Sequence, residues 1–317
     1  MRNAKFPYLP KDFIETDEGL IFAVVSYQAH EDKVGCFLRY IKQNHGWQKV
    51  TTDEANQLLA DNYPHYLYQS PQFDAVFHAV AISNIVQHYR PEHRLPAILA
   101  ASTTEPIECK LQRLLPILEQ FGVDRSWFGL TGSMLIGCQT EKSDIDLVIY
   151  GREQFHKTRE ALAQAVTKGQ LTALDNVLML DNFQRRAGEL DFDEFAWHEN
   201  RKCNKAVING TKFDIAMVNP EKQFVQDNSQ YQKVGSKIVI ATVTNDEHAF
   251  DFPAHYQIDD SETPDVLVYT HTYVGQAKRG EKVEVSAAIE CNIVTGQRRL
   301  IVGSSREAAG EYIRVYK

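Results

Sequence analysis

The sequence predicts an α+β protein in three parts: a central mixed sheet with helices, an N-terminal β/α module and a small, barrel-like C-terminal β-module. Runs rich in β-branched and aromatic residues dominate both ends of the chain, and amphipathic helical stretches alternate with short β-rich runs in its middle. At 317 residues the chain is also long for one compact domain. We therefore expect boundaries that give modules at residues 1–104, 105–222 and 223–317.

The N-terminal part is expected to begin with antiparallel strands and to continue with a helix. Residues 20–25 and 34–41 are rich in β-branched and aromatic side chains, and turn-forming clusters bound both runs. The sequence from Thr52 onward is typical of a helix start. Residues 62–94 are rich in Tyr, His and Pro, and we expect short helical pieces there, such as residues 79–89.

The central part alternates helices with short strands. Residues 106–121 have the apolar period of a helix that Gly122 ends. Strands at residues 127–131 and 145–150 are expected to enclose a short helix at 133–137. The apolar face of the first helix consists of Ile107, Leu111, Leu114, Leu115 and Leu118. Three further helical stretches are predicted at residues 154–168, 174–186 and 191–204.

A β-hairpin is predicted between the last of these helices and the C-terminal part. Asn209-Gly210 separates two β-rich runs, residues 205–208 and 211–214, and Asn-Gly in this setting is the strongest short hairpin signal. The hairpin places Asp214 on its return strand, as a neighbour of the strand at residues 145–150.

Past residue 220 the chain is β-rich again, and Gly-rich turns interrupt the short strands. This pattern is typical of a small barrel or sandwich. The strands are expected at residues 237–244, 266–274, 282–289, 298–302 and 312–316.

Composition excludes several classes of protein. The formal net charge of −8 argues against a protein that coats nucleic acid through bulk electrostatics. The five cysteines are scattered without a C-x-x-C pair, which favours reduced thiols in the cytoplasm over a zinc site or disulfide framework. We expect neither a signal peptide nor a membrane span, because residues 1–11 lack an apolar core and no apolar run reaches about 18 residues.

The most informative pattern is Gly132-Ser133, followed after ten residues by Asp144 and Asp146. Carboxylates at positions i and i+2 of a strand point to one face, roughly 7 Å apart at their Cα atoms. A tight Gly-Ser turn offers backbone N–H groups and a hydroxyl to a phosphate chain. With Asp214 as a third acid, the pattern predicts a divalent-metal site beside a phosphate cradle, and it favours phosphoryl or nucleotidyl transfer.

The predicted ligands have distinct roles. Oxygen ligands without a nearby His or Cys set favour Mg²⁺ or Mn²⁺ over zinc. We expect Asp144 and Asp146 to hold the nucleotide-side ion, and Asp214 to help hold a second ion and to take the acceptor's proton. Gly132 would permit close backbone approach to the β- and γ-phosphates, and Ser133 would donate its hydroxyl.

The motif carries a family resemblance. Gly132-Ser133 with the later Asp144-Ile145-Asp146-Leu147 resembles the signature of the DNA polymerase beta-like nucleotidyltransferase superfamily, and Asp214 matches that family's third carboxylate. The resemblance implies a nucleotidyltransferase-fold mixed sheet, Mg²⁺ dependence and an NTP substrate, but no particular acceptor. The wider chain also resembles a largely archaeal group of predicted nucleotidyltransferases, in residues 12–16, 90–95, 198–202 and 303–312.

Several basic residues have two interpretations. Arg201 and Lys202, near the end of a predicted helix, either grip the triphosphate or stabilise that helix C-terminus. Arg186, beside Arg185, either contacts nucleotide or acceptor or has the same helix-end role. A basic patch in the C-terminal part either binds RNA or is a solvated face of the β-module. The patch consists of Lys278, Arg279, Lys282, Arg298, Arg299 and Arg306.

The predicted reaction moves a nucleoside monophosphate from an NTP to an acceptor hydroxyl and releases pyrophosphate. The sequence leaves the acceptor open among an RNA end, a small metabolite and a protein side chain, and it leaves the oligomeric state open. Two other classes remain: a non-catalytic module that binds nucleotide or RNA on the same fold, and a toxin or effector that nucleotidylates protein or tRNA.

Overall fold

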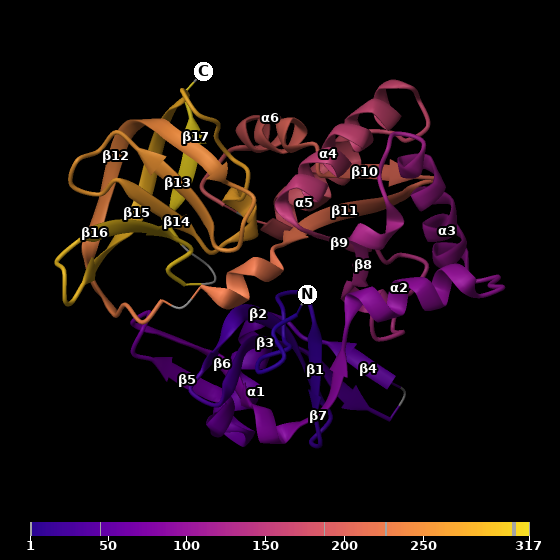
Figure 1. Ribbon diagram of the computed structural model, residues 1–317, viewed down its shortest axis with the longest axis horizontal. Helices are drawn as coiled ribbons and strands as arrows, with labels where there is room; N and C mark the ends of the chain where they lie inside the picture. The colour runs from indigo at the N-terminus through magenta and orange to yellow at the C-terminus, as the bar shows by residue number, and fades with distance from the viewer. Residues whose placement is uncertain (1, 45, 187, 226, 306–308, 317) are drawn as a thin grey trace. The chain divides into compact units, whose positions relative to one another are not determined.

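The structure, a computed structural model, describes residues 2–44, 46–186, 188–225, 227–305 and 309–316 (Figure 1). The chain forms two compact units. Unit 1 comprises Met1–Ser70, Val76–Ala173 and Asn204–Gln226. Unit 2 comprises Pro71–Ala75, Leu174–Cys203 and Asp227–Lys317.

A seven-stranded N-terminal sheet begins unit 1, in the order β5-β6-β3-β2-β1-β7 with β4 beside β3. The core beside this sheet contains Ile14, Phe22 and Leu38. Leu59 of helix α1 (Thr52–Asn62) packs in the same core. The helix starts where the sequence predicts, because Thr51 and Glu54 form a reciprocal capping box. The strands are β1 (Phe13–Thr16), β2 (Leu20–His30), β3 (Lys33–Gln43), β4 (Gly46–Lys49), β5 (Leu67–Ser70), β6 (Ala75–Ala81) and β7 (Ile85–Tyr89).

The prediction of short helical pieces at residues 79–89 is wrong. This segment forms the end of β6, a 3₁₀ turn (Ile82–Asn84) and β7. Val80 pairs with Val34 of β3, and β7 pairs with β1. Strand pairing on both sides of the turn therefore decides the conformation, as is common for β-branched residues on a half-buried sheet.

The second sheet of unit 1 is mixed and has the order β10-β11-β9-β8. Strand β9 runs antiparallel to β8 and parallel to β11, while β10 and β11 form an antiparallel hairpin. The central strand β9 is almost wholly buried. The strands are β8 (Phe128–Thr131), β9 (Ile145–Tyr150), β10 (Lys205–Ile208) and β11 (Thr211–Val218).

Three helices of unit 1 follow the first sheet or flank the second: α2 (Pro91–Ala100), α3 (Pro106–Glu119) and α4 (Arg152–Thr167). The apolar face predicted for α3 is confirmed, because all five of its predicted residues are buried. Gly122 follows α3 with a φ of 82°, a conformation that suits glycine at a helix end. Helix α2 is an element that the sequence patterns did not predict.

The two sheets of unit 1 share apolar clusters. Leu9 and Tyr27 of the N-terminal part pack with Val148 of β9 and Val218 of β11. A second cluster joins three N-terminal side chains to the segment after β8, and it contains Phe13, Ile21, Tyr40 and Leu135. Each of the three predicted modules contains one sheet, whereas the first two sheets lie in a single compact unit. The three-part division stays a prediction.

Unit 2 combines a six-stranded sheet with helices α5 (Asn176–Arg186) and α6 (Phe192–Lys202). Met179 and Phe195 of these helices pack on the strand residues of its core. The long strand β12 pairs with both β13 and β15, so the pairing returns to the strand at which it starts. The strands are β12 (Tyr231–His248), β13 (Ala254–Ile258), β14 (Asp265–Val268), β15 (Lys282–Asn292), β16 (Arg298–Val302) and β17 (Tyr312–Val315).

The predicted α+β fold class with a mixed central sheet is confirmed by this arrangement of helices and sheets. In the C-terminal part, β16 begins and ends where predicted, β15 runs three residues further, and the strand expected at residues 266–274 ends at Val268. Strand β13 was not predicted.

Candidate active site

The site is built on three neighbouring strands. Asp146 on β9 lies directly opposite Asp214 on β11, and Thr131, the last residue of β8, lies opposite Asp146 on the other side. Neighbouring strands are about 4.8 Å apart. The strand register therefore brings two of the predicted carboxylates side by side. The last residue of β8 lies next to one of them, Asp146.

The hairpin that carries Asp214 is confirmed. Asn209 and Gly210 have φ values of 46° and 77°, the positive angles that a two-residue hairpin turn requires. The turn fixes the register of β10 against β11, with Lys205 opposite Asp214. Because strand side chains alternate, this register puts Asp214 on the same face of β11 as Lys212.

The turn after β8 closes directly on Asp146. Gly132 has a φ of 67°, and a Cβ added there would lie 3.0 Å from Cγ of Asp146 and well inside van der Waals distance of its Oδ2. Only glycine fits this position without displacing the carboxylate. The predicted helix at residues 133–137 is a single 3₁₀ turn (Gly132–Met134) followed by a turn that the N–H of Cys138 closes on the carbonyl of Ser133. Ser133 is half-buried.

The electrostatics of the site centre on Asp146. Burial and the neighbouring carboxylate of Asp214 raise the pKa of Asp146 to about 7, and Asp144 adds to the rise. The ammonium groups of Lys11 and Lys212 act in the opposite direction. Carboxylates that repel each other in this way are stabilised by a shared cation.

Asp144, just before β9, forms an ion pair with Lys212, whose Nζ lies 2.9 Å from Oδ2 of Asp144. The Lys212 side chain is 5% exposed. Among the residues that the structure describes, no three His, Cys, Asp or Glu side chains already surround one point as metal ligands. The sequence patterns did not single out Lys212 as a site residue. Its position two residues before Asp214 on a strand is nevertheless a signal that the two side chains share one face of that strand.

The N-terminal part of unit 1 also reaches the site. The carbonyl of Lys11, a residue with a φ of 76°, accepts a hydrogen bond of 2.7 Å from Oγ1 of Thr131. Arg94 of α2 donates from Nε to the carbonyl of Met134, which lies in the turn after Gly132. Arg94 belongs to residues 90–95, one of the segments that resemble the archaeal group. This segment therefore contains a residue that supports the turn.

The predicted basic residues belong to unit 2. Arg201 is ion-paired with Glu281 and stacks on Trp197, with its Cζ 4.4 Å from the ring centroid. Lys202 is 2% exposed and donates to Glu199 at 2.6 Å and to the carbonyl of Thr272. Arg186 is half-buried at the end of α5. Nucleotide binding by these three residues stays a prediction.

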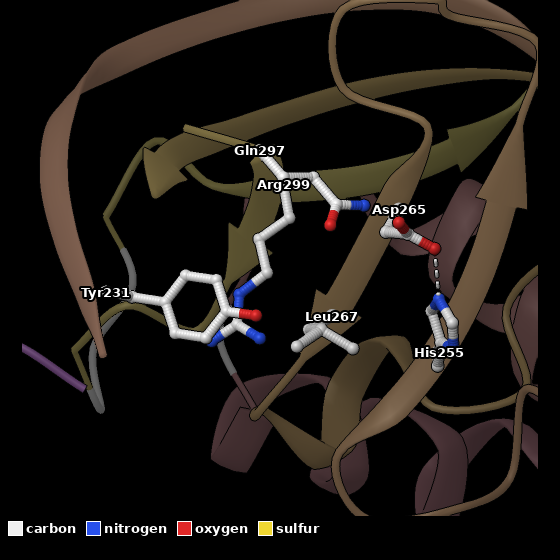
Figure 2. A pocket seen from close by; sticks show the side chains of 6 residues that line it. All are labelled: Tyr231, His255, Asp265, Leu267, Gln297 and Arg299. Atoms are coloured by element: carbon white, nitrogen blue, oxygen red, sulfur yellow. Dashed lines mark hydrogen bonds and ion pairs between the residues drawn. The ribbon is translucent and has the colours of Figure 1, made fainter. Parts of the chain in front are cut away.

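A separate pocket of about 180 Å³ lies wholly within unit 2 (Figure 2). His255 is bonded to Asp265 at 2.7 Å, and the guanidinium of Arg299 stacks 3.3 Å from the ring centroid of Tyr231 (Figure 2). Leu267 and Gln297 complete the lining. The pocket contains Arg299 and no other side chain that the sequence singles out.

Two members of the predicted basic patch are ion-paired. Arg299 pairs with the buried Glu290, and Arg298 pairs with Glu262. Arg306 lies outside the described residues, as do Glu307 and Ala308 of the resembling tail. RNA binding by this patch stays a prediction.

Comparisons with known proteins define the class of the chain. Residues 111–231, which include the turn, the three acids and Lys212, match the family model described as a nucleotidyltransferase domain. The chain is also 32% identical to an uncharacterised protein of Methanocaldococcus jannaschii over 333 aligned residues, which cover 96% of the chain and 98% of that protein. The chain therefore belongs to the nucleotidyltransferase-domain family, which confirms the predicted nucleotidyltransferase-fold sheet, and it is related over nearly its full length to this archaeal protein.

No solved structure matches the chain. Within the part of the chain that the structure describes, no helix has both the length and the apolar character needed to cross a membrane.

Proposed function

We propose that the protein is a two-metal nucleotidyltransferase that moves a nucleoside monophosphate from an NTP to an acceptor hydroxyl. The observation that carries the proposal is the register of Asp146 against Asp214, with the glycine turn closed on Asp146. A shared pair of carboxylates beside a backbone turn suits a reaction that needs both cations and phosphate contacts. The reduced cysteines favour the cytoplasm as its location.

The donor set fits Mg²⁺ or Mn²⁺. The ligands are carboxylate oxygens, the missing Cβ of Gly132 leaves room at Asp146, and the ammonium of Lys212 already stands as a cation at Asp144. In this assignment Asp144 and Asp146 hold the nucleotide-side ion, and Asp214 helps hold the second. When bound, the ions neutralise the triphosphate and lower the pKa of the attacking hydroxyl.

The protein's own residues orient the reactants. The acceptor oxygen attacks the α-phosphorus, the bond from that phosphorus to the bridging oxygen breaks, and pyrophosphate leaves. Asp214 takes the acceptor's proton. Gly132 lets the turn backbone approach the β- and γ-phosphates, and the hydroxyl of Ser133 donates to them. Arg201, Lys202 and Arg186 are the proposed additional phosphate or acceptor contacts.

Labelled nucleotides test this function. Each NTP, labelled once at the α- and once at the γ-phosphorus, is incubated with the protein, Mg²⁺ and a cell extract. We expect the α-label to enter RNA, protein or a small molecule and the γ-label to appear only in pyrophosphate. Release of γ-labelled orthophosphate would instead indicate hydrolysis. Nucleotide binding without any turnover would favour the non-catalytic module.

A further inference from the structure

The strand register places Lys212 beside the proposed metal ligands. It precedes Asp214 by two residues on β11, so both side chains leave the same face of the strand. The next residue, Phe213, pairs with Ile145, which puts Lys212 across from Asp144. The other face of β11 is apolar and carries Phe213 and Ile215.

The ammonium of Lys212 is already engaged with a predicted metal ligand. Its Nζ lies 2.9 Å from Oδ2 of Asp144, and the two side chains are 5% and 27% exposed. Lysine is a strongly hydrated point charge, so burying it is unfavourable unless a partner compensates. A buried ion pair of this kind adds little net stability compared with an apolar pair, and its position among three acids therefore points to function.

The ion pair and a bound metal compete for one carboxylate. A divalent ion held by Asp144 would repel the nearby ammonium of Lys212 and weaken its ion pair with the same carboxylate, so metal binding favours release of the ammonium. The released group has a flexible four-carbon stem and stays among carboxylates to which a triphosphate would be brought. Ammonium groups bind phosphate oxygens through strong, charge-assisted hydrogen bonds.

We propose that Lys212 is an exchangeable counter-ion, which pairs with Asp144 in the metal-free protein and transfers to the triphosphate when metal and NTP bind. The inference rests on the proposed function and deepens it, because it names a triphosphate contact that the sequence did not predict. Lys212 then opposes metal binding in the absence of nucleotide and favours nucleotide binding in the presence of metal.

Two substitutions at this position are expected to move metal affinity in opposite directions. K212M removes the competitor, so Mn²⁺ should bind about tenfold more tightly to the nucleotide-free protein. K212R offers a planar fork that grips a carboxylate with two hydrogen bonds, so Mn²⁺ should bind more weakly than to the wild type. A purely structural lysine would not produce opposite shifts.

Nucleotide affinity supplies the second readout. Binding of each α,β-methylene NTP analogue, which cannot be turned over, is measured with Mg²⁺ present. K212M should weaken binding roughly 10- to 100-fold, the value of a hydrogen bond to a charged group, and K212R should retain most of the affinity.

Lys110 provides a matched control. Its Nζ donates to Oγ1 of Thr211 at 2.7 Å, one residue from Lys212 but on the opposite face of β11. K110M therefore removes a nearby positive charge without touching the carboxylates. It should leave both affinities unchanged.

The experiment uses the full chain, with Mn²⁺ binding followed by electron paramagnetic resonance. The inference is overturned if K212M leaves both the metal and the nucleotide affinity unchanged, or if it weakens metal binding. In either case, turnover by the wild-type protein would still support the proposed function. If K212M does not fold, K212R decides alone: Mn²⁺ affinity equal to or above that of the wild type contradicts the exchange. Wild-type protein that binds neither Mn²⁺ nor nucleotide would overturn both proposals.

Discussion

At the residue scale, the candidate site depends on how closely one backbone turn approaches one carboxylate. Gly132 combines a positive φ with direct contact to Asp146, so it has two separate reasons to be glycine. Gly137, later in the same loop, has a φ of 69° but open space where its Cβ would lie. Substituting each of the two glycines therefore distinguishes the effect of steric contact with the carboxylate from the effect of backbone strain.

G132A is expected to abolish most nucleotidyl transfer, because its methyl group must displace Asp146 or open the turn. G137A should cost only about 1 kcal/mol of unfolding free energy from backbone strain and should keep most activity. Pyrophosphate release and urea unfolding of the two variants measure this. Equal activity in both variants would mean that the turn does not need to close on Asp146.

The same scale shows what local patterns can predict. Asp146, Asp214 and Gly132 were predictable because a strand period and a turn signal fix their positions. For Lys212 the strand period signals only a face shared with Asp214, and for Arg94 there is no local signal. The importance of both residues comes from their partners Asp144 and Met134, which strand register and helix packing bring together. Spacing alone does not reveal such partners.

At the element scale, helix α2 is tied to the end of β9 by Glu92. Burial alone would raise the pKa of Glu92, but the hydrogen bonds and charge of Arg2 outweigh it and lower the pKa to about 2. Tyr150 also donates to Glu92, at 2.8 Å. A carboxyl with a depressed folded-state pKa stabilises the fold above its unfolded pKa, and this stability is lost as the pH falls towards the folded value.

We expect the wild-type protein to lose up to about 3 kcal/mol of this contribution as the pH falls from the ordinary Glu value of 4.5 towards 2. E92Q lacks the titrating carboxyl and so cannot lose this stabilisation, and its unfolding free energy should fall less steeply over that pH range. Urea unfolding across this pH window provides the measurement. Parallel curves for the two proteins would show that Glu92 is not responsible.

Helix α2 also supports the turn at Gly132 through Arg94. R94A removes the hydrogen bond of 3.2 Å to the Met134 carbonyl and should loosen the turn. We expect a stability loss of about 1 kcal/mol and a several-fold rise in KM for the NTP, with kcat less affected. An unchanged KM in a folded variant would show that α2 does not position the turn.

Elements were predictable where a strong local signal agreed with tertiary packing. The apolar period of α3 and the Asn209-Gly210 hairpin are such cases. Residues 79–89 failed because their strand pairing depends on β1 and β3, which are distant in sequence. Helix α2 was not predicted because it is short, Arg90 provides no side-chain cap, and only Pro91, Leu95 and Ile98 are buried, so neither a start signal nor a sustained apolar period marks it.

At the scale of the whole molecule, the N-terminal sheet is part of the unit that contains the site. Leu9 and Tyr27 cover Val148 and Val218, and the Lys11 carbonyl holds Thr131. The sequence patterns gave no indication of this shared core, because each run shows its own apolar face but not what covers it.

A fragment of residues 105–222, the predicted central module, is therefore expected to lack cooperative unfolding, since it exposes Val148 and Val218. Thermal unfolding followed by circular dichroism tests this. A fragment that unfolds cooperatively near the transition temperature of the full chain would support the three-module division instead.

The most direct test of the central claim is the rate of metal-dependent pyrophosphate release from NTP in D146N and D214N. We predict a loss of about a thousandfold or more in each, because the two carboxylates act as one unit, with circular dichroism like that of the wild type. D124N is the matched control, since Asp124 caps the turn before β8 and should leave the rate unchanged. Wild-type rates in D146N or D214N would contradict a nucleotidyltransferase site at this pair of strands.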